Sequence, residues 1–566
     1  MGGQSANAWS SAMADGINMS FRKHIIHNIY KAHRFLRSWT SYTEDDVKRF
    51  VDSEIENGAP LNVYIDESHI SSKYTNPIQN IMLSLHARLE FSPVSKLTDT
   101  VDKILRLAIE DTKEETHQAM ESAIHNLNSM QSRAGNQTPF SSINFGTELD
   151  DAGRLATYET LRAIDEGLGN GETAIFPVSI YRVKDGINFK PGDPCYDLYQ
   201  YAIKVSAKRL FPNFEFADAP FNQQYYIEGN EDTEIATMGC RTRVVANVNG
   251  PSIVARRGNC SFTTINLPLI ALDNKGDVNG FFNDLDKYLR LTADQLYERL
   301  QYQGSKKVKN FPFLMGEGLW LDSEKLGAED TLESVVKHGT LSIGFVGLAE
   351  CLVALIGKHH GESSEAQELG LRIVKHMRKF CDEEIERSHL NYSLLATPAE
   401  SYAGNALRAI RKKYGKVPGV SDRDYVTNSN HVPVYYDINA FDKIEIEAPY
   451  HALCNAGHIC YVELDGDVSQ NLEAMEELLA WMKECGVGYG SFNHPVDYDP
   501  VCGYVGIIND ICPRCGRKEF EAIPIQRLKR MGIWRDYNSS TIGYSQNTPE
   551  EQDRKPNLYL HTNKED

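Results

Sequence analysis

The amino-acid sequence predicts an α/β protein whose 566 residues form one large domain and a small C-terminal module. Over about the first 490 residues, helical runs alternate with short apolar runs typical of strands, and no linker rich in Pro, Gly or Ser interrupts them. A sheet with many strands avoids exposed edges by closing on itself or by being covered. The pattern therefore favours a barrel for the large domain.

Helices are predicted where apolar residues recur at steps of three and four. The clearest case is the segment 95–135, in which Leu, Ile and Ala follow this spacing. The most apolar run, 341–357, carries Glu350 and is short for a membrane span, so a buried helix is predicted there. The remaining helical ranges are 14–37, 44–57, 150–168, 283–302, 361–388 and 470–485.

Strands are predicted where short runs rich in β-branched and aromatic residues lie between turn residues. These runs are LNVYID (61–66), FSSINFG (140–146), TAIFPVSIYRV (173–183), SFTTINLPLIAL (261–272), TLSIGFVG (340–347), HVPVYY (431–436) and HICYVEL (458–464). Near residue 490 the pattern changes to turn residues with three cysteines. We therefore predict a large α/β domain over 1–490, a zinc-ribbon-like module over 491–530, and a loop with a polar tail over 531–566.

Charge and cysteine usage exclude several classes of protein. The net charge of −19 argues against a nucleic-acid binder, which needs a basic face, although local arginines could still bind an anionic small substrate. The N-terminal stretch has no basic region followed by an apolar one, so neither a secretory signal nor a membrane anchor is predicted. Eleven cysteines without an export signal favour a cytoplasmic protein with reduced thiols.

A metal site is predicted in the C-terminal module. Cys512 and Cys515 form the turn CPRCG, in which two thiolates can share one ion, and Cys502 is a third candidate ligand. Asp499 stands three residues before Cys502, where a site with four thiolates would have its first cysteine. Asp499 or the nearby His494 could supply the fourth ligand, and a set of free cysteines is the alternative.

Three other segments carry residues suited to chemistry. TMGCRTRV (237–244) places Cys240 between a glycine and an arginine, although a lone cysteine is most often a small core residue. ARRGN (255–259) forms a turn before an apolar strand with Asn259 at its mouth, which a plain hairpin would also explain. TPAE (397–400) would end a strand and open a helix whose free amides could hold an anion, with Glu400 in a capping box.

Taken together, these segments resemble the anaerobic (class III) ribonucleoside-triphosphate reductases, which are glycyl-radical enzymes. The resemblance covers the chain from residue 1 to about 530, and the segments occur in the family's order. They are QTPFSSINFGT (137–147), the run from Ala174 to Asn213, TMGCRTRV, RGNCSFTTINLP (257–268), TPAE, TNSNHVPV (427–434), EAPYH (447–451), AGHICYVEL (456–464) and VCGYVG with CPRCG.

The resemblance implies a fold and roles for particular residues. The expected fold is the ten-stranded glycyl-radical-enzyme α/β barrel, incomplete at its N-terminus, with a small C-terminal zinc module. Cys240 would carry the thiyl radical, Met238 would lie beside the substrate as in the formate-using enzymes, and Asn259 would bind near the ribose hydroxyls. Thr397, Pro398, Ala399 and Glu400 would help to seat the nucleotide phosphates.

The resemblance also implies cofactors and partners. The substrate would be a ribonucleoside triphosphate, the reductant formate, and the effectors dNTPs and ATP at a specificity site between two subunits of a homodimer. A radical S-adenosylmethionine activase would install the glycyl radical. No nucleic acid or membrane partner is expected.

The sequence departs from the family pattern in three places. The family's upstream part, with the first barrel strand and a second active-site cysteine, is not found, which suggests a complementing N-terminal fragment. Asp499 replaces the first zinc cysteine. The glycyl-radical signature is altered: spacing from CPRCG favours Gly532, whereas the local sequence TIGYS favours Gly543. A homologue that binds nucleotide or a partner without forming a radical is therefore the alternative function.

Overall fold

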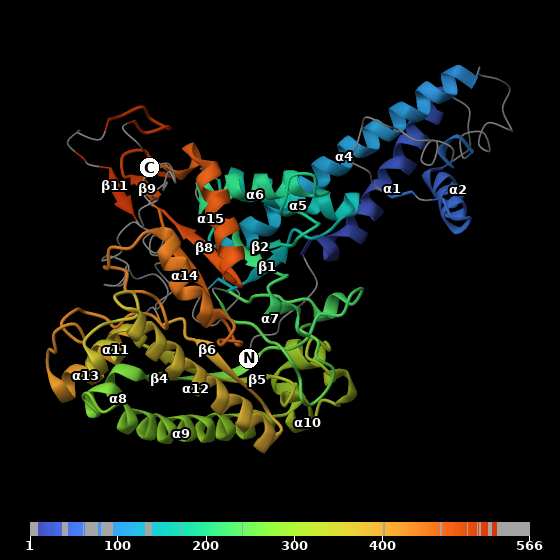
Figure 1. The fold of residues 1–566 in the computed structure, drawn as a ribbon. Helices are drawn as coiled ribbons and strands as arrows, with labels where there is room; N and C mark the ends of the chain where they lie inside the picture. Colours follow the sequence, from blue (N-terminus) through green and yellow to red (C-terminus); the bar gives the residue numbers. More distant parts are fainter. Residues whose placement is uncertain are drawn as a thin grey trace.

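The computed structural model describes residues 9–36, 43–59, 61–62, 77–80, 94–130, 138–169, 171, 173–239, 241–399, 402–464, 467–494, 496–506, 508, 511–518, 523 and 525–528. Figure 1 shows two α/β halves, one above the other, with a helical arm that projects from the upper half. Cys240, Glu400, Gly532 and Gly543 lie outside the described residues.

The upper half contains a five-stranded sheet in the order β1-β2-β3-β8-β7. Neighbouring strands are parallel except β3 and β8, which are antiparallel. The strands are β1 (Ser142–Phe145), β2 (Val178–Val183), β3 (Asn213–Phe216), β7 (Cys460–Glu463) and β8 (Tyr489–Asn493). The helices packed in this half are α5 (Asp151–Glu166), α6 (Tyr196–Arg209), α14 (Ala440–His451) and α15 (Leu472–Cys485).

The lower half contains a parallel three-stranded sheet in the order β4-β5-β6. The three strands are β4 (Asn259–Asn266), β5 (Thr340–Val346) and β6 (Asn391–Ala396). The helices of this half are α8 (Leu267–Asp273), α9 (Val278–Gly304), α11 (Leu348–Ile356), α12 (Ser364–Ser388) and α13 (Tyr402–Tyr414). Parallel strands joined by helices predict a site at the carboxyl ends of the strands, where the connecting loops meet.

The two sheets are joined by single bridges. Leu395 of β6 pairs in parallel with Gly457, which lies just before β7, and Gly457 pairs with Thr242. In the part of the chain that the structure describes, the strands thus follow one another as β1-β2-β3-β8-β7 and then β6-β5-β4. A mixed α/β fold is confirmed. Within the described residues, the sheets of the upper and lower halves together contain eight strands, and a closed ten-stranded barrel stays a prediction.

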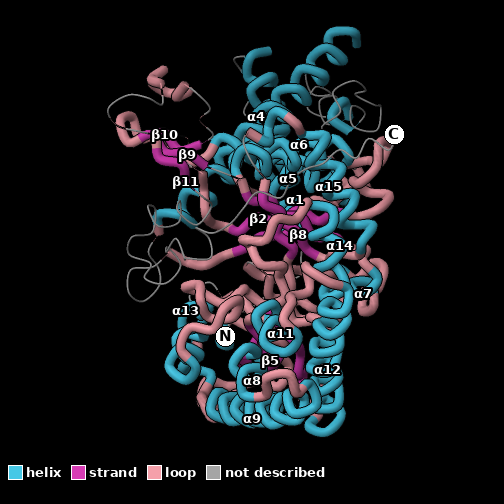
Figure 2. The backbone as a smooth tube through the Cα atoms, turned by 60° about the vertical axis from the view of Figure 1, so that its left-hand side comes forward, coloured by secondary structure: helices cyan, strands magenta, loops and turns pink. Residues whose placement is uncertain are grey.

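The arm consists of the N-terminal helices α1 (Trp9–Leu36), α2 (Glu44–Glu56) and α4 (Val94–Ser129). Helices α1 and α4 pack on each other and on α5, while α2 packs on α1. α2 begins with a capping box in which Thr43 accepts from the Asp46 amide and the Asp46 side chain accepts from the Thr43 amide. Figure 2 shows the strands of the upper half and those of the lower half in separate layers with loops between them, and the strands of the C-terminal module apart from both. The described helices do not include one that is long and apolar enough to span a membrane.

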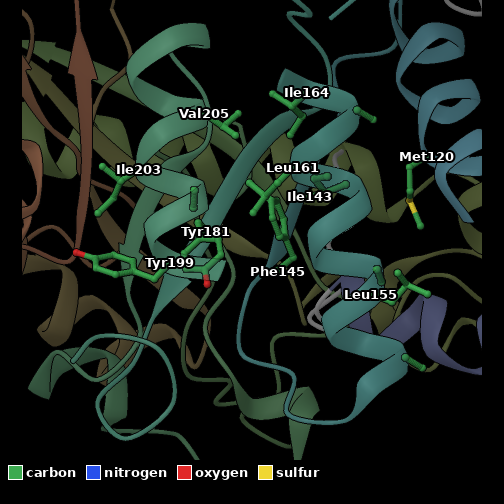
Figure 3. Packing of buried hydrophobic residues seen from close by; sticks show 14 of the residues in the cluster. Met120, Ile143, Phe145, Leu155, Leu161, Ile164, Tyr181, Tyr199, Ile203 and Val205 are labelled. Carbon is green, nitrogen blue, oxygen red and sulfur yellow. The ribbon is translucent and has the colours of Figure 1, made fainter. Parts of the chain in front are cut away.

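The core of the upper half is aromatic and aliphatic (Figure 3). Tyr181 of β2 and Tyr199 of α6 are fully buried, with ring centroids 6.3 Å apart. Leu155 and Leu161 project from α5 into the same cluster. Burial of each large apolar side chain contributes about 1.5–3 kcal/mol to the free energy of unfolding. Because α5 buries one face, apolar residues recur along 150–168 at helical spacing, and this spacing predicted the helix.

The sequence predictions failed at three apolar runs. SFTTINLPLIAL is β4 only to Asn266, because Pro268 cannot continue a ladder but fits the first turn of α8. The buried helix predicted over 341–357 forms only from Leu348 (α11), whereas the strand predicted over 340–347 is confirmed as β5, and Gly347 divides the two. HVPVYY is a loop rather than a strand. Most of LNVYID lies outside the described residues.

The C-terminal module contains a small antiparallel sheet in the order β10-β9-β11. Its strands are β9 (Val496–Asp499), β10 (Tyr504–Gly506) and β11 (Gln526–Leu528). The sheet lies beside the upper half, away from the helical arm (Figure 1). Residue 490 lies within β8 (Tyr489–Asn493), which still belongs to the upper sheet, so the small sheet begins a few residues after the change in pattern near residue 490.

Candidate active site and metal-binding cluster

The segment 236–244, called the Cys240 loop below, is attached on its N-terminal side to the five-stranded sheet. The Thr237 amide donates to Asn144 Oδ1 (3.1 Å), and Asn144 Nδ2 donates back to the Thr237 carbonyl (3.0 Å). The Gly239 amide donates to Ser142 Oγ (3.1 Å). Because Ser142 and Asn144 both belong to β1, this strand fixes the residues just before Cys240.

On its C-terminal side the same loop is attached to the three-stranded sheet. The buried guanidinium of Arg241 donates through Nη1 to the carbonyls of Ala396 (3.3 Å) and Thr397 (3.5 Å) and to Ser429 Oγ (3.1 Å). The Arg243 amide donates to the Ala456 carbonyl (2.8 Å). Cys240 therefore stands between a residue held by β1 and a residue held at the carboxyl end of β6.

Two glycines allow this close passage. Gly239 has φ 62°, and a Cβ there would lie 2.6 Å from a ring atom of Phe140. A Cβ on Gly457 would lie 2.2 Å from the carbonyl oxygen of Arg241. The Arg241 carbonyl is a backbone group and cannot move aside as a flexible side chain could, so position 457 requires glycine.

We expect Gly457→Ala to lower the free energy of unfolding by about 3 kcal/mol, because the new methyl group overlaps the Arg241 backbone. The matched control is Gly404→Ala, whose Cβ meets nothing within 4 Å in α13 and which should be neutral or stabilising by about 1 kcal/mol. Urea unfolding followed by circular dichroism measures both. Equal midpoints for the two variants would show that the close contact does not exist.

A buried carboxyl group lies beneath the Cys240 loop. Glu215 of β3 is fully buried and accepts from Thr237 Oγ1 (2.6 Å), while Arg182 Nε lies 3.8 Å from its other oxygen. Burial raises the pKa of Glu215, although Arg182 and the Thr237 hydroxyl oppose this. Glu215 was not predicted from sequence, because all four residues of NFEF are buried and the strand shows no alternation that would single out this carboxyl group.

Asn259 and Met238 occupy different positions around the loop. The Asn259 amide donates to Ser342 Oγ, and Ser342 Oγ lies 3.1 Å from Ser393 Oγ, so a polar row crosses β4, β5 and β6. The Met238 amide donates to the Thr242 carbonyl (2.6 Å), which closes the loop across Cys240. Asn259 thus lies at the amino end of β4, whereas Arg241 of the Cys240 loop bonds Ala396 at the carboxyl end of β6, the opposite end of the parallel sheet.

The segment Thr397–Ala399 continues β6 and corrects the predicted helix start. Helix α13 begins at Tyr402, not at Thr397, so Thr397 is not its capping residue. Instead Thr397 Oγ1 lies 3.1 Å from Thr264 Oγ1. It occupies the space that a side chain on Gly344 would fill. The buried Ala399 amide donates to Asn428 Oδ1 (3.1 Å) and is therefore occupied.

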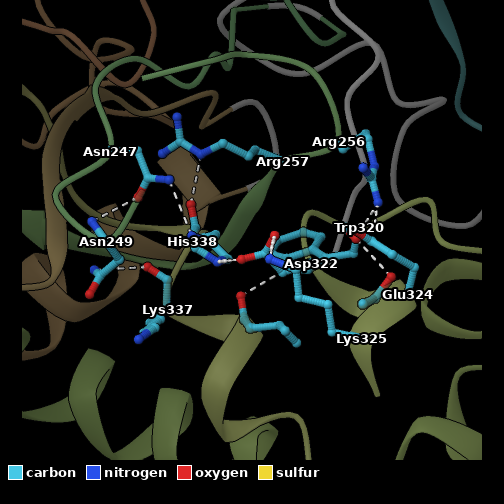
Figure 4. A network of polar contacts seen from close by, with 12 residues as sticks. Asn247, Asn249, Arg256, Arg257, Trp320, Asp322, Glu324, Lys325, Lys337 and His338 are labelled. Carbon is cyan, nitrogen blue, oxygen red and sulfur yellow. Dashed lines mark hydrogen bonds and ion pairs between the residues drawn. The ribbon is translucent and has the colours of Figure 1, made fainter. Parts of the chain in front are cut away.

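The arginines before Asn259 are structural (Figure 4). Arg257 is buried and donates to the His338 carbonyl (2.9 Å) and to two carbonyls of the preceding loop. Arg256 forms an ion pair with Glu324 on the surface. The turn before an apolar strand was correctly predicted. The guanidinium groups of Arg256 and Arg257 bond carbonyl and carboxylate oxygens of the protein itself.

His451 and His458 lie in the core. Their ring centroids are 4.2 Å apart, and both side chains are buried. Burial lowers the pKa of His451 to about 3 and that of His458 well below its usual value, so both are neutral at pH 7. His494 is also buried, with Nε2 3.3 Å from the Ser206 carbonyl.

The C-terminal module brings the four predicted metal ligands together. Candidate ligand atoms of Asp499, Cys502, Cys512 and Cys515 all lie within 4.8 Å of one another. The Cys502 and Cys512 sulfurs are 3.6 Å apart, and Cys515 Sγ is 3.3 Å from Asp499 Oδ2. Tetrahedral zinc with Zn–S bonds of about 2.3 Å places two sulfurs about 3.8 Å apart, so the donors fit this ion.

Asp499 is held by groups around the cluster. Its Oδ1 accepts from Arg517 Nε (2.8 Å) and from the Val501 amide (2.9 Å), which leaves Oδ2 facing Cys515. Burial by itself raises the pKa of Asp499, but hydrogen bonds from the Val501 amide, the neighbouring thiols and the guanidinium outweigh it and hold the pKa low. The carboxylate is thus ionised and aimed at the thiols, as a metal ligand must be.

The chain is similar in sequence to proteins of one known family. A family model described as anaerobic ribonucleoside-triphosphate reductase matches residues 1–539. The chain is 33% identical over 427 residues to the anaerobic ribonucleoside-triphosphate reductase of Salmonella typhimurium, covering 74% of this chain and 58% of that protein. It is 31% identical to the enzyme of the same name from Enterobacteria phage T4, covering 74% of this chain and 69% of that protein.

Solved structures agree in fold. An anaerobic ribonucleotide reductase superposes with a TM-score of 0.55 at 14% identity, covering 98% of this chain and 87% of that chain. The Thermotoga maritima anaerobic ribonucleotide reductase in complex with dATP and CTP gives 0.53 at 15% identity, covering 93% of this chain and 90% of that chain. At these identities the likeness supports the fold alone.

Proposed function

The chain belongs to the anaerobic ribonucleoside-triphosphate reductase family, and we propose that it reduces ribonucleoside triphosphates to 2′-deoxyribonucleoside triphosphates by radical chemistry at Cys240. The chain spans 58% of the length of its bacterial relatives, so activity, substrates and partners are carried over as proposals. The observation that carries the proposal is the Cys240 loop, held on one side by β1 and on the other by the end of β6.

The proposed chemistry suits a thiol at this position. A glycyl radical, on Gly532 or Gly543, would supply the one-electron oxidation that turns the Cys240 thiol into a thiyl radical. An S–H bond is close in strength to the ribose C3′–H bond, so the Cys240 sulfur can take that hydrogen and later return it. With formate as reductant, the overall change is ribonucleotide plus formate plus a proton to deoxyribonucleotide, carbon dioxide and water.

The residues around the loop have proposed binding roles. We assign Asn259 to the ribose hydroxyls and Met238 to the substrate side of the loop. The segment Thr397–Glu400 would seat the phosphates. Because the Ala399 amide already bonds Asn428, this role falls to the Thr397 hydroxyl rather than to that amide.

Partners follow from the same proposal. A radical S-adenosylmethionine activase would generate the glycyl radical. The solved Thermotoga maritima enzyme is described with dATP in its specificity site, which supports the proposal of dNTP effectors for this chain. A homodimer is proposed from the family resemblance alone. The function is tested by anaerobic incubation with the activase, formate and a ribonucleoside triphosphate, followed by chromatography of the nucleotides. Appearance of the 2′-deoxy product supports it, and binding without conversion favours a non-catalytic homologue.

Zinc is the proposed ion of the C-terminal module. Cys502, Cys512, Cys515 and Asp499 would bind it, and the ion would fix the turn that leads toward Gly532. Its role would be structural, because the four protein ligands leave no open position for a substrate.

We expect about one zinc per chain in protein purified without chelator, and close to none in Cys512→Ser. Asp499→Cys should keep the zinc and resist a higher chelator concentration, since it adds a fourth thiolate. Cys485→Ser, a partly exposed cysteine outside the cluster, is the control and should keep its zinc. Plasma mass spectrometry measures the metal. Equal zinc in Cys512→Ser and Cys485→Ser would exclude the site.

A further inference from the structure

The segment 427–431, called the TNSNH segment below, bonds a different partner with each of its residues. The Thr427 amide and hydroxyl donate to Glu350 Oε1 (2.8 and 2.6 Å), and the Asn430 carbonyl lies 2.9 Å from His360 Nε2. His431 Nδ1 donates to Glu447, whose carboxylate also accepts from Lys443 Nζ (2.7 Å). All five residues are buried.

Asn428 and Ser429 each bond a part of the candidate active site. Asn428 Oδ1 accepts from the Ala399 amide at 3.1 Å, and Ser429 Oγ accepts from Arg241 Nη1 at 3.1 Å. Ala399 belongs to the proposed phosphate segment, and Arg241 directly follows Cys240. Two adjacent side chains thus hold the two parts of the site that must meet at the substrate.

The backbone of this segment is also unusual. Ser429 is fully buried and has φ 42°, a left-handed conformation that costs a non-glycine residue about 1 kcal/mol or more. The surrounding bonds hold it there: the Gly347 amide donates to the Thr427 carbonyl (2.9 Å), and the Leu348 amide donates to the Ser429 carbonyl (3.2 Å). The junction of β5 and α11 therefore anchors the segment from behind.

We propose that the TNSNH segment is the positioning element of the site, in which Ser429 orients the Cys240 loop through Arg241 and Asn428 orients the phosphate segment through Ala399. The inference rests on the proposed function for its catalytic consequence. Neither residue touches the reacting atoms; each acts through the group that it holds. The two roles are distinct, because Ser429 holds the Cys240 loop and Asn428 holds the phosphate segment.

The expected kinetic result is a split between two variants. Ser429→Gly removes the hydroxyl while suiting the left-handed backbone, and it should lower kcat about 100-fold with little change in KM, because misplacement of a reacting group by about 1 Å has this effect. Asn428→Ala frees the Ala399 amide and should raise KM about tenfold with a smaller change in kcat. Simple loss of stability would not divide the two parameters in this way.

Ser421→Ala is the matched control. Ser421 is a fully buried serine in the preceding loop, and its hydroxyl accepts from the Val417 amide and donates to the Gly415 carbonyl, both at 2.8 Å. The variant loses hydrogen bonds of the same kind without touching Arg241 or Ala399. It should keep the wild-type kcat and KM.

Amide hydrogen exchange tests the positioning role without catalysis. Ser429→Gly should speed exchange in peptides covering 238–243, and Asn428→Ala should speed exchange in peptides covering Ala399. If Ser421→Ala gives the same changes, or if Ser429→Gly leaves exchange and kcat at the wild-type level, the inference is wrong. If the exchange results hold but the wild-type chain forms no deoxyribonucleotide, the proposed function fails and the positioning role stands.

Discussion

Cys240→Ser is expected to abolish formation of deoxyribonucleotide while leaving the protein folded. The hydroxyl that replaces the thiol has an O–H bond too strong to be regenerated and broken in each cycle, so the hydrogen transfer stops. Loss of one sulfur is a small change beside a deletion of core atoms, and we expect the free energy of unfolding to change by about 1 kcal/mol. The measurement is nucleotide chromatography after anaerobic activation, together with thermal unfolding.

The control for this variant is Cys485→Ser, which changes the same chemical group at a partly exposed position in α15. It should retain wild-type turnover. Binding of the ribonucleoside triphosphate should be similar in both variants, because the thiol acts on the substrate rather than holding it. Measurable reduction by Cys240→Ser would disprove the role of Cys240.

Gly532→Ala is expected to eliminate the glycyl radical signal. A glycyl radical persists because its Cα is planar and shares the unpaired electron with both flanking amides, and a side chain opposes that geometry. The tether from CPRCG to Gly532 is eleven residues shorter than the tether to Gly543, and this shorter length is nearly that of the family. The radical must reach Cys240, and a short tether from the zinc module favours that approach.

Electron paramagnetic resonance after incubation with the activase separates the two glycines. A doublet in wild type and in Gly543→Ala, absent in Gly532→Ala, is the expected pattern. The reverse pattern would assign the radical to Gly543. No doublet in active-site-intact protein would favour the alternative function, a homologue that binds nucleotide without forming a radical.

Local patterns made much of the structure predictable from sequence. The seven helical ranges correspond to α1, α2, α4, α5, α9, α12 and α15, with ends displaced by a few residues. These helices bury one apolar face, and that face repeats every three to four residues in the chain itself. The ligands of the metal cluster were also predictable, because Asp499, Cys502, Cys512 and Cys515 lie within seventeen consecutive residues and a short turn is enough to gather them.

Other elements could not be read in this way. The run 431–436 has the composition of a strand, yet Val432 donates its amide to Glu447 rather than to a neighbouring strand. Thr397 was predicted as a helix cap, but its hydroxyl forms a hydrogen bond with the Thr264 hydroxyl, next to Gly344. In each case a partner distant in sequence overrode a local preference that is worth about 1 kcal/mol.

The sequence by itself therefore determined the α/β class and the family, and it supplied the residues that we propose for radical chemistry and metal binding. Only the tertiary structure decided which residues hold them in place. Ser429 meets Arg241 across 188 positions of sequence, and Asn428 meets Ala399 across 29. No periodicity or spacing encodes such contacts, because they arise where the ends of β5 and β6 and the Cys240 loop converge, and hydrogen bonding there depends on the packing of all three.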